Sequence, residues 1–225
     1  MCLIVSQNKG DSIFSPKNIA LAWESNSDGA GYMFCRGQSL VIRKPFFLRE
    51  EFEASYKVDF VAYGSRSPFV LHFRVATHGL CDHAGTHPHI ISEDLAMAHN
   101  GVLPLLPPTR TESDTAFFCR TVLVFRTPKD ILSKPYQRFL TDFIGKNNKL
   151  VFLDKYRHVT IINKPMGAQH SKTRWYSNTY WLWSREFLFP CIAKKKEKVH
   201  TSFRDYWDDA LASERKELSE IRRIR

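Results

Sequence analysis

Short runs of apolar, β-branched and aromatic residues recur along most of the chain and predict strands. Turn-forming Gly, Asn, Ser and Pro residues bound many of these runs. The predicted strands cover residues 3–7, 31–37, 39–44, 69–77, 95–103, 149–154 and 158–163, with another strand near the end of 166–178. Residues 25–31 and 78–92, rich in polar residues and glycine, are expected to form loops.

Helical patterns lie between these runs. Ser15-Pro16 is typical of an N-cap followed by proline in the first turn and predicts a helix to about Glu24. Ser113 similarly predicts a helix to about Phe125. Further helices are expected at 47–58, 134–144 and 201–225. Because the two kinds of element do not alternate regularly, the pattern favours an α+β fold with largely antiparallel sheets.

Length and composition describe an ordinary globular chain. Its 225 residues fit one domain with a tail. No apolar run approaches the roughly 20 residues of a membrane span, and no secretory signal is recognisable at the start. The five cysteines are odd in number and widely scattered, which favours reduced thiols and a cytoplasmic location.

The chain is basic, with 33 Lys and Arg against 23 Asp and Glu, a net charge of +10. This charge is compatible with nucleic acid or another anionic partner. The basic residues are spread along the chain, however, so the charge alone does not indicate such contact. Residues 191–225 are expected to form a basic extension that carries an amphipathic helix.

The chain begins Met1-Cys2 and continues as an apolar run. Cys2 is either a small apolar residue of a first strand or, once Met1 is removed, a residue that carries both a thiol and a free α-amino group. The second interpretation would unite a nucleophile and its base in one residue.

Six of the nine histidines lie between residues 72 and 99. Cys81, His83, His87 and His89 are competent zinc ligands, but their spacing, C-x-H-x-x-x-H-x-H, matches no standard zinc pattern. We therefore expect no metal and no other cofactor. The alternative is a loop whose histidines hydrogen-bond to the backbone.

Other polar residues suggest a site for a substrate with an α-carboxylate, an α-amino group and a side-chain carbonyl. Arg74, near the end of a predicted strand, has the planar fork that binds a carboxylate. Asn100-Gly101, on a predicted turn, offers an amide and a backbone N–H for an oxyanion. Asp114 is suited to an ammonium group. Taken singly, these residues are better explained as a surface ion pair, a plain turn and a helix-start charge, and the functional interpretation depends on their combination.

Several stretches carry a resemblance to a known family. They are Cys2 after Met1, Arg74-Val75-Ala76-Thr77-His78-Gly79 with His87-Pro88-His89, Ala98-His99-Asn100-Gly101, and more weakly Glu112-Ser113-Asp114-Thr115. In this order and spacing they resemble the class II glutamine amidotransferases, and most of all the glutaminase domains of glucosamine-6-phosphate synthases. The resemblance covers residues 2–115 closely and 116–190 only in general pattern.

The resemblance implies a glutaminase domain over 2–190 with an αββα sandwich of the N-terminal-nucleophile hydrolase type, two antiparallel sheets between helical layers. It also implies that Cys2 attacks the amide of glutamine while Asn100 and Gly101 hold the oxyanion. The implied substrate-binding residues are Arg74, Thr77, His78, His87 and Asp114.

Two positions depart from the family pattern, because Leu3 replaces a usual glycine and Val75 replaces a usual aromatic residue. A separate synthetase or other acceptor enzyme is the expected recipient of the ammonia. The alternatives are an amidase for another γ-glutamyl-type amide and a catalytically degenerate binding module.

Overall fold

A computed structural model describes residues 2–75, 85–103 and 112–182 of the chain. The predicted extension at 191–225 lies outside these residues. Within them, no helix is long and apolar enough to cross a membrane.

The described residues form two antiparallel sheets accompanied by helices, which confirms the predicted mixed fold with antiparallel sheets. The first sheet has the strand order β3-β2-β4-β1-β10-β9. Its strands are β1 (Leu3–Gln7), β2 (Ala30–Arg36), β3 (Ser39–Phe46), β4 (Phe69–Phe73), β9 (Ala168–Gln169) and β10 (Arg174–Tyr176). The second sheet has the order β5-β6-β7-β8 and comprises β5 (His89–Ser92), β6 (Leu95–Asn100), β7 (Lys149–Asp154) and β8 (Val159–Ile162).

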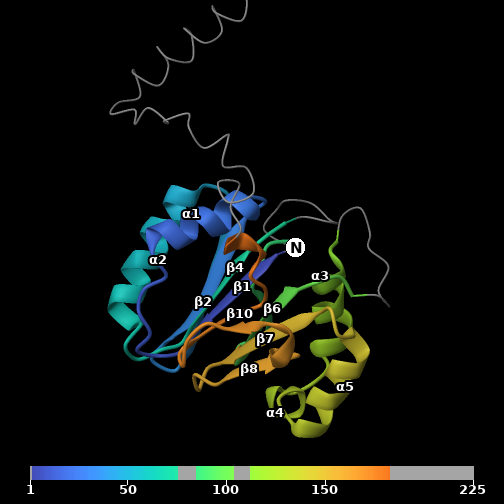
Figure 1. Cartoon of the computed structure of the whole chain (residues 1–225). Helices are drawn as coiled ribbons and strands as arrows, with labels where there is room; N and C mark the ends of the chain where they lie inside the picture. The colour runs from blue at the N-terminus through green and yellow to red at the C-terminus, as the bar shows by residue number, and fades with distance from the viewer. Residues whose placement is uncertain (1, 76–84, 104–111, 183–225) are drawn as a thin grey trace, which may run out of the picture. The chain divides into compact units, whose positions relative to one another are not determined.

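The helices lie on both sides of the sheets (Figure 1). The α-helices are α1 (Pro16–Ser25), α2 (Arg49–Tyr63), α3 (Asp114–Phe118), α4 (Pro128–Ile131) and α5 (Lys134–Ile144). A π-helical turn, η1 (Cys119–Leu123), follows α3, and 3₁₀ turns form η2 (Lys164–Met166) and η3 (Tyr180–Leu182).

Three clusters of buried apolar residues connect these elements. The first joins the outer face of the first sheet to α1 and α2, through residues such as Leu3, Phe52 and Phe73. The second joins the other sheet to the helices of residues 114–144, through residues such as Met97 and Leu140. The third lies between the sheets and contains residues that alternate with those of the other two clusters along each strand.

Local sequence signals explain where several helices begin. The Ser15 hydroxyl accepts a hydrogen bond from the Asn18 N–H, and the Ser113 hydroxyl accepts one from the Ala116 N–H. Both predicted caps are therefore confirmed. The helix after Ser113 is shorter than predicted, because after Phe118 the chain widens into the π-helical turn.

The loop predicted at 78–92 is wrong at its end. Residues 89–92 form β5, in which His89 and Ile91 are buried while Ile90 is 65% exposed. The alternation spans only four residues, so it does not predict a strand after a stretch whose Gly and Pro residues predict a loop. In the opposite sense, the strand predicted at 69–77 ends at Phe73.

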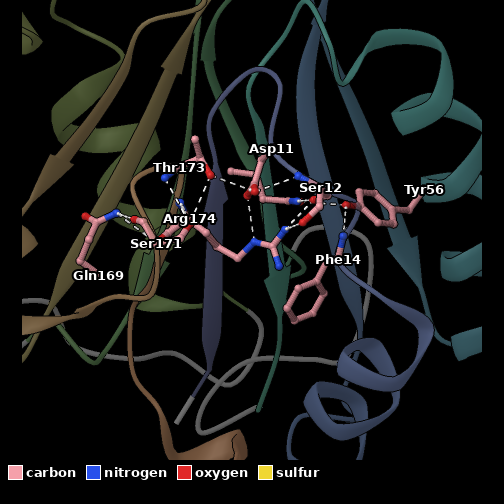
Figure 2. Close-up of polar contacts among 9 residues, drawn as sticks. Asp11, Ser12, Phe14, Tyr56, Gln169, Ser171, Thr173 and Arg174 are labelled. Atoms are coloured by element: carbon pink, nitrogen blue, oxygen red, sulfur yellow. Dashed lines mark hydrogen bonds and ion pairs between the residues drawn. The ribbon is translucent and has the colours of Figure 1, made fainter.

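A buried ion pair fastens β10 to the segment that follows β1 (Figure 2). Arg174 Nε lies 2.9 Å from Asp11 Oδ2, and both side chains are only 7% exposed. Arg174 also donates to the Ser12 hydroxyl, and Thr173 donates to Asp11 Oδ1. Every charged group of this network has a partner, as burial requires.

Candidate active site

Strand alternation brings the first candidate residues together. Ile4 of β1 and Ala96 and Ala98 of β6 point into the cluster between the sheets. Because side chains alternate with a period of two, Cys2 and Asn100 belong to the same inward faces as these residues. The nucleophile and the amide predicted from distant parts of the sequence therefore come from facing strands.

The Cys2 thiol is partly buried and lies against the backbone of Val75. Its Sγ is 3.4 Å from both the N and the O of Val75. Burial raises the pKa of the thiol, while the Val75 N–H and the positive charges nearby, including Arg74, oppose this shift. The resting thiol is accordingly protonated near neutral pH, so its use as a nucleophile requires a base.

Gly101 follows Asn100 and has a backbone that demands glycine. Its φ is +141°, and a Cβ at this position would lie 2.0 Å from Asn148 Oδ1. The side chain of Asn148 therefore packs directly against the turn predicted to hold the oxyanion.

A chain of buried polar groups holds Asn148 in place. Its Oδ1 lies 2.8 Å from His99 Nε2, and its Nδ2 donates to the Ile144 carbonyl. His99 Nδ1 lies 2.6 Å from the Thr115 hydroxyl. Burial lowers the pKa of His99, so the ring is neutral at pH 7, with Nε2 donating to the Asn148 oxygen and Nδ1 accepting from Thr115.

One pocket unites the three predicted catalytic residues. It has a volume of about 370 Å³, within the range of small-molecule sites. Its lining contains Cys2, Val75, Asn100, Gly101, Val102 and residues 144–148.

Arg74 lies beside Cys2, the predicted nucleophile. Leu3 pairs with Phe73 across β1 and β4, so extending this register by one residue sets Arg74 opposite Cys2. Arg74 is only 4% exposed, and its backbone N–H donates to the Gly29 carbonyl.

Asp114 is the first residue of α3, one of the helices that pack against the second sheet. Its Oδ2 accepts a 2.6 Å hydrogen bond from the Leu103 N–H, and its Oδ1 accepts one from the Thr115 N–H. Asp114 does not belong to the pocket lining, but this bond from the Thr115 N–H links it through Thr115, His99 and Asn148 to the turn.

His87 lies in a buried group of histidines. Its ring centroid is 4.2 Å from that of His72 and 4.5 Å from that of His89, and its Nδ1 accepts from the His99 N–H. Burial lowers the pKa of His72 to about 3 and holds those of His87 and His89 well below 6.5. His87 does not line the pocket.

Several sequence-based candidates fall outside the described residues, namely Thr77, His78, Cys81 and His83. Among the residues that are described, no group of three or more His, Cys, Asp or Glu side chains is arranged to hold a metal ion.

The two departures from the family pattern have different positions. The Leu3 side chain is fully buried in the cluster beneath α1 and α2, on the face of β1 opposite Cys2, and does not line the pocket. Val75 does line the pocket, and its backbone contacts the Cys2 sulfur. Only the second departure therefore changes the walls of the site.

Sequence reasoning missed three polar residues of the site: Asn148, Ser177 and Asn178. Asn148 is described above, Ser177 Oγ lies 2.7 Å from Asn100 Nδ2, and Asn178 Nδ2 donates to the Cys2 carbonyl. They occur in ordinary polar stretches whose local pattern gives no signal. Only strand pairing brings them to the site.

Comparisons with known proteins add little to this description. No protein-family model matches the chain, and no curated protein sequence does. One similar solved structure is a glutamine phosphoribosylpyrophosphate (PRPP) amidotransferase from B. subtilis complexed with ADP and GMP, with 15% identity and a TM-score of 0.47. The match covers 81% of this chain and 43% of that chain, so this chain spans less than half of its length. We therefore infer function from the pocket and the sequence motifs.

Proposed function

We propose that the protein is a glutamine amidotransferase of the class II, N-terminal-nucleophile type, with the αββα fold of that class. The observation that carries the proposal is the single pocket lined by Cys2, Asn100 and Gly101. Two separate stretches of the sequence predict these three residues. The odd number of scattered cysteines supports a cytoplasmic setting.

In the proposed reaction, removal of Met1 frees the α-amino group of Cys2. This amine has an ordinary pKa of about 7.7–8.0 and takes the proton of the buried thiol. The sulfur then forms a bond to the side-chain amide carbon of glutamine, and the carbonyl oxygen becomes an oxyanion. When the carbon–nitrogen bond breaks, the leaving nitrogen receives the proton and departs as ammonia. Water, deprotonated by the same amine, hydrolyses the thioester to release glutamate and restore the thiol.

Asn100 and Gly101 stabilise the oxyanion in this scheme. The positive φ of Gly101 and its contact with Asn148 define the direction of the turn. Preorganised donors of this kind contribute because they need no rearrangement as charge develops.

Arg74 and Asp114 bind the two charged ends of the substrate. Arg74, opposite Cys2 in register, binds the α-carboxylate of glutamine. Asp114 binds the α-ammonium, and Thr77, His78 and His87 complete the substrate site. An acceptor enzyme takes up the ammonia, because ammonia released into solvent is lost to synthesis.

The decisive experiment combines mass spectrometry with turnover. Intact mass is expected to show a chain that begins at Cys2, and the glutamine analogue 6-diazo-5-oxonorleucine is expected to label Cys2 alone. Cys2→Ala should release no glutamate from glutamine. Cys35→Ala is the matched control, because Cys35 is also a free thiol but is buried and lies outside the pocket.

Retention of Met1 in active protein, or full activity in Cys2→Ala, would reject the mechanism. Preference for an amide that lacks an α-carboxylate would favour a different amidase. Binding of glutamine without turnover would favour a degenerate binding module.

A further inference from the structure

Ser177 connects the strand of the nucleophile to the strand of the predicted oxyanion donor. It follows β10 and is fully buried. Its hydroxyl accepts a 2.8 Å hydrogen bond from the Ile4 N–H, and its own N–H donates to the Ile4 carbonyl. Ile4 lies two residues after Cys2, so Ser177 is fixed relative to the nucleophile.

The same hydroxyl contacts the side-chain amide of Asn100. The distance from Asn100 Nδ2 to Ser177 Oγ is 2.7 Å, and both residues are at most 1% exposed. Asn100 Oδ1 is buried and has no hydrogen-bond partner among the described residues. A buried amide oxygen without a partner is unusual in a folded protein.

The hydrogen-bonding capacity of the Ser177 hydroxyl suggests a partner for Asn100 Oδ1. A hydroxyl has two acceptor lone pairs and one proton to donate. The Ile4 and Asn100 N–H groups occupy both lone pairs, which leaves the proton for another acceptor. Turning the Asn100 amide by 180° about its terminal bond lets Ser177 donate this proton to Oδ1. Both hydrogens of Nδ2 are then directed away from Ser177.

We propose that Ser177 is a positioning residue that holds the Asn100 amide with Oδ1 on its hydroxyl and Nδ2 toward the pocket. In either orientation Ser177 is the described side chain that hydrogen-bonds to this amide. The turned orientation satisfies the oxygen and puts Nδ2 in its place, as a buried donor that has no partner among the described residues and that a developing oxyanion can accept from. This inference rests on the proposed function, and it adds a residue that does not itself touch the substrate.

The test is a double-mutant cycle on kcat and KM for glutamine. Ser177→Ala should lower kcat at least about tenfold, equivalent to about 1.4 kcal/mol, and change KM less than about twofold. In an Asn100→Ala background, Ser177→Ala should have almost no further effect on kcat, because the amide it positions is gone.

Ser67→Ala is the matched control. The buried Ser67 hydroxyl also accepts a 2.8 Å hydrogen bond from a strand N–H, that of Cys35. Ser67 precedes the first residue of β4, whereas Arg74 follows the last, so Ser67 lies at the opposite end of this strand. This variant should lose stability without a fall in kcat. The rate of Cys2 alkylation by a small neutral reagent, equal in wild type and Ser177→Ala, checks that the variant remains folded around the nucleophile.

Two outcomes overturn the inference while the proposed function stands: unchanged kcat in Ser177→Ala, or the same loss of kcat in both backgrounds. An effect confined to KM also contradicts it. If the wild-type protein, with Met1 removed, does not hydrolyse glutamine, the proposed function fails first and the inference falls with it.

Discussion

Buried polar groups lie near both ends of strand β1, but only those near the Gln7 end all have hydrogen-bond partners. At the Gln7 end, Gln7 accepts from the Tyr56 hydroxyl and donates to the Ser12 carbonyl, and Arg174 pairs with Asp11. Toward the Cys2 end, one atom of the Asn100 side-chain amide and His72 Nδ1 lack partners within the described part of the chain.

On the proposed function, the paired groups near Gln7 form a structural network and the unpaired groups near Cys2 belong to a functional one. Buried polar groups that are fully paired stabilise one arrangement and leave nothing for a ligand. Groups left unpaired reduce stability, and they are retained where binding or chemistry uses them. The predictions below test this contrast, beginning with the largest effect.

Asp11→Ala should destabilise the polar network at the Gln7 end of β1. It leaves the buried Arg174 guanidinium without its counter-charge, so we expect a loss of about 3–5 kcal/mol in the free energy of unfolding, measured by urea denaturation. The folded fraction should keep its kcat. Arg49→Ala, which removes an exposed ion pair, should cost less than about 1 kcal/mol. Equal losses in the two variants would contradict the distinction.

Asn100→Ala should impair the proposed site toward the Cys2 end of β1. We expect kcat for glutamine to fall by about 10²–10³, the usual effect of losing one oxyanion donor. Gln7→Ala removes a buried amide at the other end of β1 and should change stability but not kcat. Steady-state glutamate release measures both variants, and a comparable loss of kcat in Gln7→Ala would show that the two ends are not functionally separate.

Arg74→Lys should reveal whether the guanidinium fork is used. Lysine retains the charge but not the two parallel donors, so kcat/KM for glutamine should fall at least about tenfold. Asp114→Asn should cost at least as much, because it removes the counter-charge of the α-ammonium. Neither change should slow alkylation of Cys2 by a small neutral reagent. Normal turnover in both variants would reject glutamine as the substrate.

Acid should lower the free energy of unfolding because of the buried histidines. Burial lowers the pKa values of His72, His87 and His89 in the folded state, and positive charge at Lys44 adds to the effect. The unfolded chain therefore binds more protons below pH 6.5, and the free energy of unfolding should fall as pH drops from 6.5 toward 5.

Each histidine that stays neutral contributes a slope of about 1.4 kcal/mol per pH unit. His72→Gln keeps a donor for the His99 carbonyl. It should reduce the slope by the contribution of one histidine, about 1.4 kcal/mol per pH unit. Urea denaturation at pH 7, 6 and 5 measures this change, and an identical slope in the variant would show that His72 does not contribute.

Much of the local structure was predictable because its causes are local. Ser15 and Ser113 begin helices through hydrogen bonds to residues only three positions away. Alternation along β1 and β6 likewise shows which side chains share a face with Cys2 and Asn100. The short strand β5 was missed because its pattern is only four residues long and follows a Gly- and Pro-rich stretch.

The sequence alone indicates the candidate chemistry: a cysteine after Met1, an arginine suited to a carboxylate, and an Asn-Gly turn. The tertiary structure is needed to show that Cys2, Asn100 and Gly101 share one pocket, and that Leu3 faces away from it while Val75 lines it. The same is true of Ser177, which reaches Ile4 across 173 positions of sequence. Contacts of this kind depend on how β1 pairs with β10 and on how the two sheets face each other. No local pattern encodes such pairings, because they are stabilised by residues distant in the chain.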